Sequence, residues 1–193
     1  MNIPDAKKVH DFTRLLELAK AMSVEKDLYA LLDLIVQRTT EVMEADRTSL
    51  YLVDADKQQL WTRIAQGLEI KEVRVPIGTG ISGHVAKTRE TVNIQDAYLD
   101  PRFDRGWDMK TGYRTRSILC MPLLTHEDRV VGVIQVLNKK GGAFTDYDES
   151  LLAALGSHAA IALDQARLMQ HYVEKQRMQE ALRIARDIQM SLL

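Results

Sequence analysis

The C-terminal quarter of the chain constrains the fold more than any other part. Residues 146–193 contain no proline and a single glycine, Gly156. Because proline and glycine are the residues that most readily interrupt helices, this segment predicts one helix of about 48 residues, roughly 70 Å long at 1.5 Å per residue. A domain of ordinary size cannot cover both ends of such a rod, so we expect part of it to project from the domain.

The two halves of this predicted helix differ in composition. The first half has a broad apolar stripe suited to packing on a sheet: Leu151, Leu152, Leu155, Ala159, Ile161 and Ala162. Beyond Arg167 a thin stripe remains, spaced alternately by four and three: His171, Lys175, Met178, Leu182, Ala185, Gln189 and Leu192. This spacing is typical of an imperfect coiled-coil seam, so we expect residues 167–193 to form a signalling helix.

The rest of the chain changes from helical to strand periodicity. Apolar residues recur at helical spacing twice within residues 1–45, which predicts an N-terminal helix over residues 1–22 and a second helix after it. Alternation then predicts strands at residues 48–53, 59–64, 72–75, 91–94, 117–124 and 130–138, with a short helix near 78–89 and a long polar loop at 95–116. This order indicates an α+β fold, a central antiparallel sheet of about six strands with helices packed on one face.

Composition narrows the classes of partner. The net charge is −1 and the pI is about 6.5, so there is no electrostatic reason to expect nucleic acid or an anionic membrane as a partner. No apolar stretch approaches the roughly 18 residues that a membrane span requires. The single cysteine, Cys120, excludes an internal disulfide framework and fits a reducing compartment. We therefore expect a cytoplasmic protein.

No arrangement of residues predicts catalysis or a metal site. The five histidines lack paired metal-ligand spacing, and there is neither a P-loop nor a nucleophile elbow. Four aspartates share the 95–116 loop, but they lack the alternation and the terminal glutamate of a calcium loop: Asp96, Asp100, Asp104 and Asp108. We expect no enzyme activity, no metal and no required cofactor.

Gly78, Gly80 and Gly83 spell the GxGxxG pattern of dinucleotide-binding folds. That fold needs a buried strand before the pattern and a parallel βαβ unit around it, and neither is predicted here. We expect these glycines to allow a tight turn into a short helix whose free N–H groups face a cavity and could receive a phosphate.

The segment 138–149 permits two interpretations. Asp146 as N-cap, with Glu149 three residues later and Phe144 as a hydrophobic staple, would be a capping box. Alternatively, Lys139 pairs with an acidic residue and holds the loop in place. The local pattern alone favours the capping box.

At this point the sequence resembles a known family. Residues from about 25 to 166 are similar to GAF domains, specifically those of cyclic-nucleotide phosphodiesterases and cyanobacterial-type adenylyl cyclases, through VPIGTGISGHVAKT, NIQDAYLDPRF and TGYRTRSILCMP. The family signature NKxnFxxxDE is matched in full by Asn138, Lys139, Phe144, Asp148 and Glu149. The resemblance implies a GAF domain over residues 23–166. It also reverses the preference above, because in that family the lysine and aspartate form an ion pair that secures the pocket.

The resemblance also implies a set of ligand-binding positions. Carried over from the matched segments, they are Ser49, Ala65, Gln66, Ile81, Ser82, Asp108, Thr111, Thr115 and Gln135. Ala65 and Gln66 stand where cGMP-binding relatives resemble one another in having an aromatic residue that stacks on the base and then an acidic residue. Gln135 likewise replaces a carboxylate. A lost stacking partner costs on the order of 1 kcal/mol, so a bound cyclic nucleotide (cAMP or cGMP) is an expectation that these departures weaken.

A second resemblance concerns the C-terminus. Residues 179–193 look like the linker before SpoIIE-like metal-dependent serine/threonine phosphatase domains. This implies that a phosphatase effector follows in the full-length protein, although none of its acidic metal ligands lies in this chain.

Together these features predict a ligand-sensing regulatory domain. A small molecule would bind between the sheet and the 95–116 loop, and a homodimer through the N- and C-terminal helices would carry the signal to the effector. The alternatives are a ligand-free dimerisation scaffold with a vestigial pocket, or a sensor of another small molecule. A bilin sensor is disfavoured because the loop has no cysteine, and a haem sensor would need a histidine such as His84 in the cavity.

Overall fold

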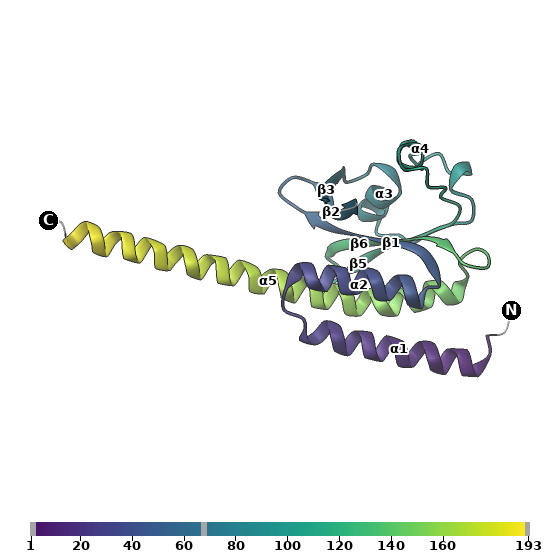
Figure 1. The fold of residues 1–193 in the computed structure, drawn as a ribbon, viewed down its shortest axis with the longest axis horizontal. Coiled ribbons are helices and arrows are strands. Elements are labelled where there is room, and N and C mark those ends of the chain that lie inside the picture. The colour runs from purple at the N-terminus through teal and green to yellow at the C-terminus, as the bar shows by residue number, and fades with distance from the viewer. Residues whose placement is uncertain (1–2, 67–68, 192–193) are drawn as a thin grey trace.

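Alternating apolar and polar residues build one six-stranded sheet in the order β3-β2-β1-β6-β5-β4 (Figure 1). Every neighbouring pair of strands is antiparallel. The strands are β1 (Ala45–Asp54), β2 (Gln59–Gln66), β3 (Glu69–Pro76), β4 (Val92–Ile94), β5 (Ile118–Leu124) and β6 (Val130–Lys139). The computed structural model describes residues 3–66 and 69–191, without the side chains of residues 63–66, 69–71 and 191. The predicted α+β class is confirmed.

Three long helices cover one face of the sheet, which we call the helical face. They are α1 (Asp5–Val24), α2 (Leu28–Val42) and α5 (Asp146–Ser191). Figure 1 shows α2 and α5 side by side against the sheet, with α1 packed outside them. The main apolar core lies between these helices and the strands, and it includes the fully buried Leu31, Leu119, Ile134 and Leu152.

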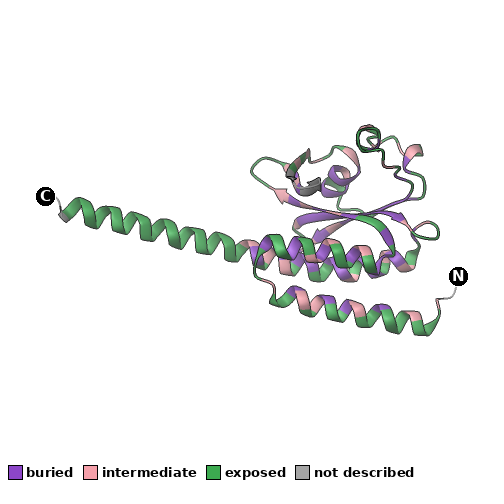
Figure 2. Ribbon diagram, viewed as in Figure 1, coloured by how far each residue is buried: buried purple, intermediate pink, exposed green. Residues whose placement is uncertain are grey.

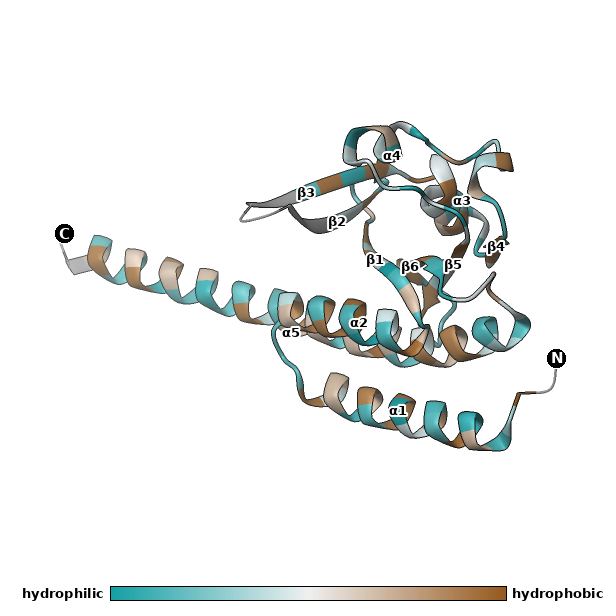
Figure 3. Cartoon of the chain, turned by 45° about the vertical axis from the view of Figure 1, so that its right-hand side comes forward, coloured by the Kyte–Doolittle hydropathy of each residue, from teal (hydrophilic) through white to brown (hydrophobic). Residues whose placement is uncertain are grey.

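The opposite face, which we call the pocket face, carries only short elements. They are α3 (Gly80–Thr88), the 3-10 turn η1 (Ala97–Leu99) and α4 (Gly106–Thr111). Figure 3 shows α3 and α4 on the side of the sheet away from α1, α2 and α5. We call residues 95–116, which include η1 and α4, the pocket loop. A second, smaller apolar cluster lies on this face and includes Leu60, Val85 and Ile118.

Helix α5 is continuous, but its burial changes abruptly along its 46 residues. Ala166 is its last buried residue, and every residue from Leu168 to Met190 is exposed. Figure 2 shows this outer half projecting from the domain as an exposed rod. The predicted projection of the long helix is therefore confirmed, and Leu192 of the predicted seam lies outside the described residues.

The start of α5 corrects one local prediction. The capping residue is Thr145, whose hydroxyl accepts a hydrogen bond from the Asp148 N–H at 3.3 Å, while Asp148 Oδ2 accepts from the Thr145 N–H at 2.8 Å. These reciprocal bonds form a capping box one residue earlier than the predicted Asp146–Glu149 pair. The prediction was wrong because Glu149 is used elsewhere, where it accepts from Asn93 Nδ2 of β4 at 2.7 Å.

Candidate ligand pocket

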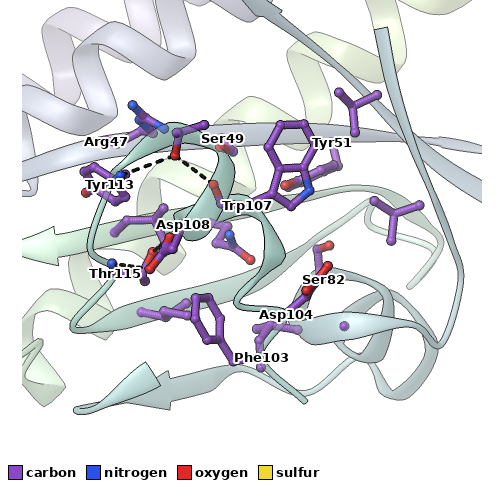
Figure 4. A pocket seen from close by; sticks show the side chains of 18 of the residues that line it. Arg47, Ser49, Tyr51, Ser82, Phe103, Asp104, Trp107, Asp108, Tyr113 and Thr115 are labelled. Carbon is purple, nitrogen blue, oxygen red and sulfur yellow. Dashed lines mark hydrogen bonds between the residues drawn. The ribbon is translucent and has the colours of Figure 1, made fainter. Parts of the chain in front are cut away.

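A cavity of about 200 Å³ lies on the pocket face, between the sheet, α3 and the pocket loop (Figure 4). Its apolar wall comes from β3, α3, the pocket loop, β5 and β6: Val73, Val75, Ile81, Phe103, Ile118 and Leu137. Small-molecule pockets combine such a wall with a few convergent polar groups. This cavity therefore has the composition of a binding pocket.

The predicted binding residues converge on this cavity wherever their side chains are described. These are Ser49, Ile81, Ser82, Asp108, Thr111, Thr115 and Gln135. Ser49 and Gln135 are register partners on the adjacent strands β1 and β6, which places both at the floor. Ala65 and Gln66 lie at the end of β2, but their side chains lie outside the described residues. That these side chains bind a ligand stays a prediction.

The glycines before and within α3 shape the approach of this helix to the cavity. Gly78 has a φ of +94°, a conformation that favours glycine, and a Cβ on Gly83 would lie 2.6 Å from the Pro76 carbonyl oxygen. The chain therefore turns directly from β3 into α3. Thr79 caps α3 without a side-chain hydrogen bond, so the N–H groups of its first turn have no side-chain partner there. Thr79, Gly80, Ile81 and Ser82 all line the cavity, which makes this helix end a candidate anion site.

Several residues that line the cavity were not predicted from the sequence, although the position of Tyr51 follows from strand periodicity. Tyr51 lies two positions after Ser49 on β1, so period two puts both on one face. Burial raises the pKa of the Tyr51 phenol to about 12, against the opposing effect of its hydrogen bonds with Ser49 and Ser82. The other polar or aromatic lining residues that were not predicted are Arg47, Thr79, Phe103, Asp104, Trp107 and Tyr113.

Hydrogen bonds within the pocket loop hold α4 in place. The buried Asp108 carboxylate accepts from the Thr115 N–H at 2.7 Å, from the Thr115 hydroxyl at 2.8 Å and from the Tyr98 hydroxyl at 3.1 Å. The Thr111 hydroxyl donates to the Trp107 carbonyl at 2.8 Å. Asp108, Thr111 and Thr115 therefore organise the loop as well as line the cavity.

Asn138 fastens the end of the pocket loop to β6. Its Nδ2 donates to the Tyr113 hydroxyl at 2.8 Å and to the Arg114 carbonyl at 2.9 Å, and its Oδ1 accepts from the Arg116 N–H at 2.6 Å. Asn138 is buried and has a φ of 57°, a conformation that asparagine tolerates better than most residues. The adjoining part of the loop is also held by the Arg47 guanidinium, which lies 4.5 Å from the centroid of the Tyr113 ring.

The next residue, Lys139, faces the opposite side of the sheet. Its Nζ lies 2.9 Å from Asp148 Oδ1 and donates to the Met43 carbonyl at 2.9 Å. Asp148 is buried, and Lys139 is only 13% exposed at its side chain. Neither residue lines the cavity. The signature residues Phe144, Asp148 and Glu149 thus gather where α5 begins, and Lys139 joins that site to β6.

The aspartates of the pocket loop each have a local partner. Asp96 accepts from the Tyr98 N–H, Asp100 pairs with Arg102 at 2.6 Å, and Asp104 accepts from the Gly106 N–H. The hydrogen bond from Arg102 lowers the pKa of Asp100. Within the described residues, no group of three or more His, Cys, Asp and Glu side chains is arranged to hold a metal ion. The only cysteine, Cys120, is fully buried, and burial raises the pKa of its thiol.

Comparisons with known sequences and structures agree on one domain family. A model of the GAF domain matches residues 27–163. The "Probable 3',5'-cyclic phosphodiesterase pde-5" of Caenorhabditis elegans is 34% identical over 202 residues, which cover 97% of this chain and 27% of that protein. The "Dual 3',5'-cyclic-AMP and -GMP phosphodiesterase 11" of Drosophila melanogaster is 36% identical, covering 95% of this chain and 14% of that protein. The chain thus spans about a quarter or less of the length of these relatives.

Solved structures show the same fold. The GAF domain of a phosphoenolpyruvate-protein phosphotransferase from Coxiella burnetii has a TM-score of 0.73 at 22% identity, covering 83% of this chain and 96% of that one. A free methionine-R-sulfoxide reductase from Neisseria meningitidis has a TM-score of 0.70 at 21% identity, covering 88% of this chain and 96% of that one. In the part of the chain that the structure describes, no helix has the length and apolar character needed to cross a membrane.

Proposed function

Because the chain belongs to the GAF domain family, we propose that it is a regulatory module that binds a small molecule in the cavity and signals through α5. A sensory role agrees with relatives in which the matching region occupies a minor part of a phosphodiesterase. We place the module in the cytoplasm, in keeping with its single buried cysteine.

The observation that carries this proposal is that two consecutive residues of β6 contact the pocket loop and the start of α5, respectively. Asn138 holds the pocket loop, and Lys139 holds the first turn of α5. The Cα positions of consecutive residues lie about 3.8 Å apart, so the two holding contacts are joined by a single peptide unit. A ligand that draws the pocket loop inward or outward would therefore displace the start of α5.

We propose a cyclic nucleotide, cAMP or cGMP, as the ligand. The α3 N-terminus would receive the phosphate, with Ser82 beside it, and the Ser49–Gln135 pair would contact the base or the ribose. Phosphodiesterases that act on these nucleotides are among the relatives, which supports this ligand class. The cavity is smaller than the roughly 300 Å³ at which ligand pockets usually begin, so binding requires the pocket loop to move outward.

We further propose that the module acts as a homodimer. The exposed outer half of α5 keeps the seam residues Met178 and Leu182 in solvent, and α1 exposes Val9, Phe12 and Leu16. A second copy would cover these side chains. The effector that α5 would control is proposed to be a serine/threonine phosphatase on the resemblance of residues 179–193, whereas the relatives named above are phosphodiesterases. Assaying the full-length protein against a phosphopeptide and a cyclic nucleotide would distinguish the two effectors.

The experiment that tests the sensor proposal is a thermal-shift and calorimetry screen with cAMP, cGMP and related nucleotides. A ligand at 100 times its Kd should stabilise the fold by about 2.7 kcal/mol, which raises the Tm by several degrees. Ser82→Ala should reduce this shift, whereas Ser150→Ala, at an exposed site on α5, should leave it unchanged. No shift with any nucleotide would remove cyclic nucleotides from the proposal.

A second candidate function is a dimerisation scaffold with a vestigial pocket. The observation in its favour is that the pocket loop satisfies its own polar groups, since Asp108 already accepts three hydrogen bonds. In that case the protein would still dimerise, and no compound of the ligand panel would change its Tm or give a calorimetric binding signal. Stabilisation by a compound unrelated to nucleotides would instead indicate a sensor of another small molecule.

A further inference from the structure

We propose that Trp107 is the stacking platform of this pocket, so that the ligand has a flat heteroaromatic ring that lies against the indole. The inference rests on the proposed sensor function and specifies its ligand class. In the resemblance described above, a stacking aromatic belongs at position 65, and this chain has alanine there. Trp107 supplies an aromatic ring to the cavity from the pocket loop.

The position of Trp107 fits this role. It lines the cavity, yet 42% of its surface is exposed, so part of the indole has no protein packed on it (Figure 4). Tryptophan is highly buried on average, and an exposed indole at the edge of a pocket keeps apolar area available for a ligand. Val73 and Val75 of β3 also line the cavity and add apolar area against which a ring can pack.

Hydrogen bonds of the neighbouring residues fix the backbone conformation of α4 around Trp107. The next residue, Asp108, is anchored by the three hydrogen bonds from Thr115 and Tyr98. The Trp107 carbonyl accepts the hydroxyl hydrogen bond of Thr111. Because these hydrogen bonds keep α4 internally ordered, α4 can move outward with the pocket loop as one piece, and little further ordering of α4 opposes stacking.

The polar residues that line the cavity indicate a second chemical feature of the ligand. The first turn of α3 and Ser82 are suited to an anionic group, whereas Trp107 and the β3 valines are suited to an uncharged ring. A ligand that contacts both groups of residues has a planar ring and an anionic group in one small molecule. Cyclic nucleotides meet this description, and so do other heteroaromatic phosphates or carboxylates.

The chain offers a direct spectroscopic test, because Trp107 and Trp61 are its only tryptophans. Trp61 packs against the core of the helical face, away from the cavity lining. In a Trp61→Phe variant, all indole emission therefore comes from Trp107. Titration with cAMP and with cGMP, followed by fluorescence and calorimetry in parallel, should give a saturable emission change whose midpoint agrees with the calorimetric Kd.

The affinity test uses three substitutions on α4. Trp107→Leu keeps an apolar side chain without an aromatic face and should weaken binding about tenfold, the usual scale for a base stacked on an aromatic residue. Trp107→Phe should restore most of that loss. Met109→Ala removes a bulky side chain that is 77% exposed on the same helix and does not line the cavity, so it should leave the affinity unchanged.

The outcomes separate this inference from the sensor function. Calorimetric binding with unchanged Trp107 emission and full affinity in Trp107→Leu would overturn the stacking role and leave the sensor intact. Equal losses in Trp107→Leu and Trp107→Phe would also overturn it, since bulk rather than the aromatic face would then matter. Absence of binding by every nucleotide in the unaltered chain would overturn the cyclic-nucleotide proposal, and absence of binding by a panel of other heteroaromatic phosphates and carboxylates as well would overturn the stacking platform.

Discussion

The two faces of the sheet are built from the same strands but close in different ways. On the helical face, Leu119, Met121 and Leu123 of β5 pack under α2 and α5 in a continuous core. On the pocket face, the alternate residues Ile118 and Cys120 belong to the smaller cluster, to which α3, a helix of 9 residues, and the pocket loop contribute. The inner half of α5, with α2 beside it, covers the helical face, whereas the short α3 and a loop leave a space on the pocket face. The cavity therefore results from the smaller elements that cover this face, and the strands of the sheet are the same for both faces.

The faces also differ in what holds their cover in place. The helices of the helical face are held mainly by apolar packing, with one buried ion pair, Lys139–Asp148, at the start of α5. The pocket loop is held mainly by hydrogen bonds, centred on Asp108 and Asn138. Hydrogen bonds contribute about 1 kcal/mol each and re-form with water or a ligand, so this cover can open without unfolding the domain. Lys139 and Asn138, adjacent in sequence, connect the two kinds of cover.

The largest expected effect is that of Asp148→Ala, which removes the Lys139–Asp148 ion pair on the helical face. Because it leaves the largely buried Lys139 with only the more exposed Glu44 carboxylate, 3.5 Å from its Nζ, and removes the capping box of α5, it should lower the free energy of unfolding by about 3–5 kcal/mol. Urea unfolding measures this loss. Asp146→Ala, at an exposed site in the same turn, is the matched control and should cost only about 0.3–1 kcal/mol. Similar small losses in both variants would contradict the role of the ion pair in securing α5.

The next prediction compares two adjacent residues of β5 that are both fully buried. Leu119→Ala opens a hole in the continuous core of the helical face and should cost about 2–5 kcal/mol. Ile118→Ala enlarges a cavity that already exists, so fewer contacts are lost and the cost should be about 1–2 kcal/mol lower than for Leu119→Ala. Chemical denaturation of both variants tests the contrast. Equal costs would show that the pocket face is packed as tightly as the helical face.

A third prediction uses the pKa of Tyr51, which burial raises to about 12 from an ordinary value near 10. Between pH 10 and 12 the unfolded chain loses this proton before the folded chain does, so folding stability is complete below pH 10 and falls as the pH rises towards 12. Since Tyr51 is only partly buried, we expect a loss of about 2 kcal/mol from this group.

The measurement is urea unfolding at pH 9 and pH 11.5 for the unaltered chain and for Tyr51→Phe. The variant should lose about 2 kcal/mol less over this interval, because its pocket face has no phenol to ionise. Tyr172→Phe, at an exposed site on the outer half of α5, is the matched control and should behave like the unaltered chain. If both variants show the same pH dependence as the unaltered chain, then Tyr51 ionises as readily in the folded state as in the unfolded state.

These contrasts bear on what the sequence could predict. The length of α5 follows from the absence of proline, and the floor of the cavity follows from period two on β1, which places Ser49 and Tyr51 on one face. Such features depend on local rules of chain geometry. The signature residues could be placed at the start of α5 for the same reason, since a strand end and a helix start are both local signals.

The remaining features depend on contacts between distant residues. Trp107 faces the cavity because Thr115 and Tyr98 fix Asp108, an arrangement that the polar composition of residues 95–116 does not indicate. The choice of Thr145 over Asp146 as the cap of α5 was equally undecided by local pattern, because both residue types cap helices well. It is decided by Lys139, which holds Asp148, and by Asn93, which holds Glu149.

The smallest expected effect on the fold concerns the outer half of α5, which belongs to neither face. Leu182 is 66% exposed there and contacts no buried core, so Leu182→Gln should change the free energy of unfolding of the isolated domain by less than about 0.5 kcal/mol. If this half pairs with a second copy, the same substitution places a polar side chain in an apolar seam and should weaken dimerisation. Sedimentation across a range of concentrations measures dimerisation, and unfolding at low concentration measures the domain alone. An unchanged dimer would remove Leu182 from the interface, and a clearly destabilised monomer would mean that the outer half supports the domain after all.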